Sequence, residues 1–274
     1  MTVSPLVDLT RSLRLIATAS CSRSSRTNLA VAGAYATEAI VLRSFRTGEA
    51  DRVVHLLTPG FGRVNVIAKG ARKTTGKMGA RLEPLTRIDA IVQPGKSDLS
   101  TITGADVLWS GDELRRDPIR ALAATGGIEA IVRLFPEPEP DERLYRGLQR
   151  YLEALTEPLG DDVRGGADTI TLGFVLKLLA LAGWRPEVAA CVACGAPTAV
   201  YDAAAGCAFC ASCGSGSPLD PIAASAAAQL LAEPLGVVTT PAPVARAAIA
   251  RVCRETAEQH GGVRLALLGQ GVTA

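Results

Sequence analysis

Histidine, aromatic residues and long apolar segments are all scarce in this sequence. Two histidines occur among 274 residues, and Phe, Trp and Tyr together make up 4% of the chain. His55 and His260 are far apart, and no Ser/His/Asp set or metal-ligand helix accompanies either of them. Nucleophilic and metal-assisted catalysis both depend on such sets. We therefore expect a protein that is not an enzyme.

The sequence has no run of about 18 uncharged apolar residues, which is the length that a membrane-spanning helix requires. The longest apolar segment, residues 172–183, is interrupted by Lys177 and by glycines. With 48% hydrophobic and 20% charged residues, the composition is that of a globular protein and excludes global disorder. We expect one or two globular domains and no membrane partner.

Nucleotide-binding signatures are also missing. The sequence contains no Gly-x-Gly-x-x-Gly element, so a dinucleotide fold is not indicated. Residues 70–78 resemble a P-loop, but five residues rather than four separate Gly70 from Gly76. Met78 stands where a P-loop has the hydroxyl that binds Mg²⁺. No nucleotide is expected as a ligand.

The first 34 residues differ in composition from the rest of the chain. They contain four arginines and one acidic residue, Asp8, and are rich in Ser, Thr and Ala. Residues 13–21 are too short and too interrupted, by Arg14, for the core of a secretory signal. We expect residues 1–34 to be a disordered N-terminal extension. The remaining chain has 25 basic and 26 acidic residues, so any affinity for nucleic acid must come from a local patch.

Short β-branched segments follow one another from residue 35, with glycine-containing turns between them. No segment of helical periodicity separates them, so parallel βαβ units are not indicated. Closure into a small five-stranded barrel would remove the exposed edges. We predict a first domain over residues 35–115, with strands at residues 38–45, 51–57, 63–68, 87–93 and 98–103.

Basic residues are concentrated within this first domain. Between Arg63 and Arg87 there are seven basic residues and a single acid, Glu83. The densest part, residues 69–79, is rich in Gly and Thr and is typical of a loop. An ordinary solvated loop mixes both signs of charge, whereas this excess favours a site for a polyanion. The predicted DNA-binding residues are Arg63, Lys69, Arg72, Lys73, Lys77, Arg81 and Arg87.

The second half of the chain has helical periodicity. Asp117 and Pro118 form a plausible helix start, and residues 136–140 (Pro-Glu-Pro-Glu-Pro) end that helix as a stiff linker. The apolar stripes of these helices indicate a packed core rather than a cofactor site. We predict a helical domain over residues 116–274, with helices near residues 117–135, 144–155, 171–181, 222–234 and 243–259.

Five of the seven cysteines lie within 23 positions inside this helical domain. Cys191, Cys194, Cys210 and Cys213 have the spacing C-x2-C-x15-C-x2-C, which is typical of a structural zinc site. Each C-x-x-C pair places two thiolates on one side of a tight turn, and two such turns complete a tetrahedron. We predict one structural Zn²⁺ in a module at about residues 188–219.

Cys207 leaves the ligand assignment open, because Cys207 and Cys210 are also separated by two residues. We favour Cys210 with Cys213, since Gly214 follows them as Gly195 follows the first pair. Disulfides fit poorly without a secretory signal, and a redox pair would require a βαβ setting. Residues 186–245 contain no Lys or Arg, so the module is expected to hold the helices together or contact a protein rather than phosphate.

Several segments together resemble the bacterial recombinational repair family RecO. The resemblance covers about residues 35–260 and is carried by residues 37–44 (TEAIVLRS), 48–54 (GEADRVV), 62–64 (GRV), 68–73 (AKGARK) and 82–84 (LEP). It implies an α+β protein with an N-terminal OB-fold barrel, a helical domain and a four-cysteine zinc module. It does not cover residues 1–34, and Gly206-Cys207 departs from the family's glycine-rich element before the third cysteine.

The resemblance also implies a function. Members of this family bind single- and double-stranded DNA and anneal complementary strands, and with RecR they load RecA onto strands coated by single-strand-binding protein. We therefore expect a cytoplasmic, nucleoid-associated recombination mediator. The alternative is a zinc-stabilised scaffold that binds RNA or a protein and has no annealing activity.

Overall fold

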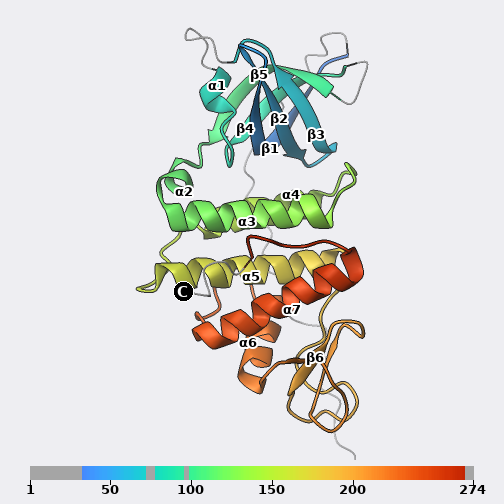
Figure 1. Ribbon diagram of the computed structural model, residues 1–274. Helices are drawn as coiled ribbons and strands as arrows, with labels where there is room; N and C mark the ends of the chain where they lie inside the picture. The colour runs from blue at the N-terminus through green and yellow to red at the C-terminus, as the bar shows by residue number, and fades with distance from the viewer. Residues whose placement is uncertain (1–32, 72–77, 96–98, 269–274) are drawn as a thin grey trace, which may run out of the picture.

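Five antiparallel and parallel strands close into a barrel at one end of the molecule (Figure 1). The computed structural model describes residues 33–71, 78–95 and 99–268. The strands are β1 (Tyr35–Thr47), β2 (Asp51–Thr58), β3 (Gly62–Ala68), β4 (Arg87–Gln93) and β5 (Leu99–Trp109). They are arranged in the order β1-β2-β3-β5-β4, and β4 pairs again with β1. The predicted five-stranded barrel is confirmed.

The length of β1 explains how so few strands close a barrel. Its first half pairs with β4 and its second half with β2, and the register shifts between Val41 and Arg43. Such an irregularity bends a strand and increases its twist. The parallel pairing of β3 with β5 completes the circle. One bent strand therefore serves two neighbours, as in OB-fold barrels.

The rest of the described chain is mainly helical, and Figure 1 shows the helices stacked beneath the barrel. The short helix α1 (Met78–Arg81) lies between β3 and β4. The others are α2 (Asp112–Arg116), α3 (Pro118–Leu134), α4 (Glu142–Ala154), α5 (Val163–Leu181), α6 (Pro221–Ala232) and α7 (Pro243–Gly261). Among the described residues, none of these helices is both long and apolar enough to cross a membrane.

Two helices begin at aspartate caps that the local sequence supplies. The Asp117 side chain accepts hydrogen bonds from the N–H groups of Ile119 and Arg120, and Pro118 occupies the first turn, as predicted. Helix α5 starts eight residues before the predicted position, with Asp162 as its cap. The two glycines of its first turn weaken the sequence signal, since glycine is a poor helix former.

The barrel has a hydrophobic core of its own, and one side of the barrel joins the helices in a second buried cluster. Ile40, Leu42 and Leu57 of the barrel are buried in the same cluster as residues of α3, α4 and α5. At the edge of this contact the Tyr145 hydroxyl donates to the Glu38 carboxylate at 3.1 Å. Burial of apolar area at this scale is the main stabilising contribution in folding. The barrel is therefore held in a fixed position on the helical layer.

A small sheet with the four cysteines lies at the opposite end of the molecule from the barrel (Figure 1). Its strands are β6 (Val200–Asp202), β7 (Cys207–Phe209) and β8 (Ser217–Pro218). Tyr201 is buried against α7, where its hydroxyl lies 2.7 Å from the Thr256 hydroxyl. The module thus docks on α7 through its sheet.

Candidate metal centre and nucleic-acid interface

Four cysteine sulfurs converge beside the small sheet. The Sγ atoms of Cys191, Cys194, Cys210 and Cys213 all lie within 4.8 Å of one another. Cys194 is 3.7 Å from Cys210 and 3.6 Å from Cys213, measured between sulfurs. A tetrahedron with metal–sulfur bonds of about 2.3 Å has sulfur–sulfur edges of about 3.8 Å. Two of the six sulfur–sulfur separations are close to this edge and the others do not exceed 4.8 Å, so the four thiols are near enough to share one tetrahedral ion.

Backbone N–H groups point at these sulfurs. Those of Cys210, Cys194 and Ala193 donate to the Cys191 sulfur and lower its pKa to about 6. Similarly, the N–H of Ser212 is the largest cause of the lowered pKa of Cys210. Hydrogen bonds to the charged form favour ionisation, and the thiolate is the form that binds a metal. The pKa is lowered for these two cysteines and raised for Cys194 and Cys213, where neighbouring cysteine side chains contribute to the rise. A set of four cysteine sulfurs fits a structural metal ion such as Zn²⁺.

Two glycines allow the cysteine turns to form. Gly195 has φ of 73°, and its N–H donates to the Cys191 carbonyl at 2.8 Å. This left-handed conformation is costly for residues with a Cβ atom. Gly214 packs under the Phe209 ring, and a Cβ there would lie 2.5 Å from the ring. Both turns therefore depend on glycine, although for different reasons.

Cys207 lies outside this group. It starts β7, is half-buried, and is absent from the cluster of converging thiols among the described residues. Burial is the main cause that raises its pKa. Cys253 is fully buried in α7, and Cys21 lies outside the described residues. The four cysteines of the two C-x-x-C turns are thus the ones that the structure brings together.

The predicted DNA-binding residues fall into two groups. Arg72, Lys73 and Lys77 lie outside the described residues, and they flank exposed Lys69 in the sequence. The three arginines of the set, by contrast, contact protein atoms.

Arg63, Arg81 and Arg87 are tied to neighbouring segments. The Arg63 guanidinium donates to the Pro136 carbonyl in the loop between α3 and α4. Arg87 lies 3.5 Å from the Glu153 carboxylate of α4, measured from nitrogen to oxygen. Arg81 donates to the Ala105 carbonyl at 2.7 Å. Arg63 and Arg87 therefore help to join the barrel to the helices, and Arg81 ties α1 to β5.

Sequence analysis missed an aromatic and basic surface on the barrel. Arg43 and Phe45 are exposed on β1, and half-buried His55 lies beside them on β2. The Phe45 and His55 rings are 5.3 Å apart between centroids. A count of basic residues along the sequence does not find this surface. The available signal was that positions 43 and 45 share one face of a strand whose hairpin partner carries His55.

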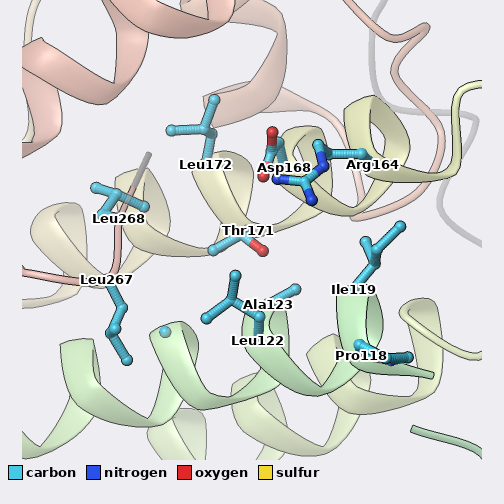
Figure 2. A pocket seen from close by; sticks show the side chains of 11 residues that line it. Pro118, Ile119, Leu122, Ala123, Arg164, Asp168, Thr171, Leu172, Leu267 and Leu268 are labelled. Atoms are coloured by element: carbon cyan, nitrogen blue, oxygen red, sulfur yellow. The ribbon is translucent and has the colours of Figure 1, made fainter. Parts of the chain in front are cut away.

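A separate cavity lies between α3 and α5, with a volume of about 190 Å³ (Figure 2). Figure 2 shows Leu122 and Leu172 on its walls, Leu267 and Leu268 at one end, and Asp168 near the other. It is smaller than typical pockets for small molecules, which measure roughly 300–1,000 Å³. Its apolar lining indicates incomplete packing between helices rather than a catalytic site.

Comparison with protein families accounts for both halves of the chain. A family model described as "Recombination protein O N terminal" matches residues 33–110. A second model, "Recombination protein O C terminal", matches residues 115–267. The chain belongs to the RecO family. The first match contains the barrel, and the second contains the helices and the cysteine module.

Individual RecO proteins are similar over most of their length. The chain is 37% identical to the DNA repair protein RecO of Rubrobacter xylanophilus over 190 residues, which are 68% of this chain and 74% of the relative. It is 35% identical to that of Geobacter metallireducens over 206 residues, covering 72% and 80% of the two chains. A similar protein from Bifidobacterium animalis is 36% identical over 178 residues, or 64% and 72%. This RecO-family chain thus belongs among DNA repair and recombination proteins.

Proposed function

We propose that this RecO-family protein is a recombination mediator that binds single- and double-stranded DNA and anneals complementary strands. The barrel with its basic segment at residues 63–87 is the observation that carries the proposal. Annealing requires no covalent chemistry, because two polyanions need only charge neutralisation to approach each other. The protein acts without a nucleotide and is not an enzyme.

The phosphate contacts are assigned to the seven basic residues of that segment. Lys69, Arg72, Lys73 and Lys77 belong to its Gly- and Thr-rich stretch of sequence and are assigned to bind phosphates directly. Arg63, Arg81 and Arg87 have protein partners and add positive potential. Arg81 and Arg87 lie beside the carboxylates of Asp106 and Glu153, and a guanidinium paired with a carboxylate has less charge to offer a phosphate.

We further propose that Cys191, Cys194, Cys210 and Cys213 hold one structural Zn²⁺. The sulfur separations and the all-cysteine donor set support this assignment. In this assignment the ion joins the two C-x-x-C turns. Cys207 is not a ligand in this assignment.

The partners follow from the family. We propose that the protein acts in the cytoplasm at the nucleoid, where with RecR it loads RecA onto strands coated by single-strand-binding protein. The lack of Lys and Arg in residues 186–245 suits the cysteine module to protein contacts or to structural support rather than to DNA.

A salt titration of binding to single-stranded DNA, duplex DNA and RNA tests the central proposal. We expect both forms of DNA to bind with an affinity that falls steeply as salt increases, and complementary strands to anneal without ATP. Binding to RNA alone, or no annealing at any salt concentration, would instead favour the scaffold alternative.

A further inference from the structure

We infer that the outer face of the β1–β2 hairpin is a base-stacking platform for single-stranded DNA, formed by Phe45 and His55 and flanked by Arg43. The inference rests on the proposed function, because it names the side chains through which the DNA-binding barrel holds bases rather than phosphates. None of these three residues belongs to the basic segment at residues 63–87.

Strand register brings the platform residues together. Arg43 is paired with His55, and Phe45 is paired with Val53. Phe45 and His55 are therefore diagonal neighbours on one face, and their ring planes meet at 63°. On the next strand Asn65 is paired with His55 and is exposed. An aromatic ring, an imidazole and an amide thus follow one another across three strands.

The exposure of Phe45 requires an explanation. Its side chain is 47% exposed, and it belongs to neither of the two buried hydrophobic clusters. A large aromatic residue on a sheet face with basic neighbours is the arrangement by which proteins stack nucleic-acid bases. A tyrosine or phenylalanine face accepts any base, so this contact would not depend on sequence.

The charges around the platform suit a polyanion. Burial, together with the positive charges of Arg43 and Arg63, lowers the pKa of His55 below its ordinary value. A neutral imidazole offers a flat ring for stacking and leaves phosphate binding to the arginines. Glu137 acts on Arg63 from the loop after α3, and Glu129 lines the adjoining groove. The face itself carries exposed Arg43 beside the two rings.

A groove gives a strand room to lie against the platform. It has a volume of about 520 Å³ and runs between β1 and α3, with Arg43 and Phe45 on one side and Thr125 and Glu129 on the other. The Glu129 carboxylate accepts hydrogen bonds from two backbone N–H groups of the C-terminal segment, at 3.3 and 2.8 Å. Its charge is thus partly compensated and opposes a nearby phosphate less than a free carboxylate would.

Binding of the full chain to a thymidine oligonucleotide and to an abasic oligonucleotide of equal length tests the inference. Both probes carry the same phosphates, but only the first has bases to stack. Phe45→Ala should weaken binding to the thymidine probe about 10-fold. It should leave the abasic affinity and the salt dependence unchanged, because it removes no charge.

Phe61→Ala is the matched control. Phe61 is also 47% exposed, but it lies beyond the opposite end of β2. Its ring contacts that of Tyr35, with 4.1 Å between the ring centroids. Its replacement should change binding to the thymidine probe by less than about two-fold, the range of ordinary surface substitutions. An equal loss in both variants would overturn the assignment to Phe45.

Phe45→Trp provides a direct signal that does not depend on loss of binding. Its emission should be quenched by the thymidine probe and unaffected by the abasic one. Parental affinity in Phe45→Ala, or equal losses on both probes, would refute the platform while leaving DNA binding by the barrel in place. If the parent protein binds neither probe, the proposed function itself fails.

Discussion

The cysteine centre gives a sharp test because Cys194 is exposed. In a protein without a metal, Cys194→Ser is an ordinary surface substitution that changes the free energy of unfolding by about 0.5 kcal/mol or less. This corresponds to roughly 1–2 °C in Tm for a chain of this size. If Cys194 is a zinc ligand, the same change removes one of four metal bonds. The loss of unfolding free energy in that case depends on how much of the module is held by contacts other than the metal.

The sheet side of the module is secured by packing, whereas two of the four cysteines, Cys194 and Cys213, are exposed. Tyr201, Ala208 and Leu219 are buried, and the Tyr201 hydroxyl pairs with Thr256. These contacts should persist without metal, so only part of the stabilisation is lost. Structural zinc contributes about 10–16 kcal/mol to isolated fingers. We expect a loss of about 4 kcal/mol from one ligand here, which lowers Tm by about 10 °C.

Metal analysis and calorimetry of anaerobically purified protein measure both quantities. The parent should contain one zinc per chain, and Cys194→Ser should contain less and melt earlier. Cys207→Ser is the matched control, since it alters a nearby thiol outside the cluster, and it should keep the zinc and the parental Tm. A parent without stoichiometric zinc, or equal Tm values in all three proteins, would refute the metal assignment.

Two further predictions concern the barrel loop and the C-terminal segment. Replacing Arg72, Lys73 and Lys77 by alanine should weaken binding to every DNA sequence alike. For a single strand it should also flatten the slope of log affinity against log salt by about 2. Fluorescence anisotropy measured over a range of salt concentrations gives this slope, and an unchanged slope would place the phosphate contacts elsewhere. Glu129→Ala should lower Tm by roughly 5 °C, because it leaves two backbone N–H groups of the C-terminal segment without their acceptor; calorimetry checks this, and Glu142→Ala on the exposed surface of α4 is the control.

The sequence was sufficient for the barrel because its strands are marked by local signals. Alternation of apolar residues and glycine turns predicted all five strands, and only their ends differ from those observed. The small sheet β6–β8 was missed, since its strands are two or three residues long and show no period. The predicted helix at residues 171–181 is shorter than α5. The start of α5 depends on the Asp162 cap and on close packing of Gly166 against Leu159 rather than on helix propensity.

The basic residues show what sequence counting cannot distinguish. Arg87 belongs to the same basic segment, residues 63–87, as Lys69, yet it is paired with Glu153 of α4. Such a pair depends on tertiary packing and has no local signature. Conversely, Arg43 and Phe45 lie outside the basic segment, and strand register places them beside His55. Charge density along the chain therefore locates a region of positive potential but not the side chains that face a ligand.

The separation of the two candidate sites has a consequence for how they can influence each other. The barrel and the cysteine module lie at opposite ends of the molecule, with the helical layer between them (Figure 1). Electrostatic interactions in solution are screened over about 8 Å at physiological salt, so charge at one end has little effect at the other. The shared core of barrel and helices and the docking of Tyr201 on α7 are continuous mechanical links, however. Loss of zinc should therefore act on DNA binding through the stability of the fold, and the salt dependence of the barrel should remain that of the intact protein.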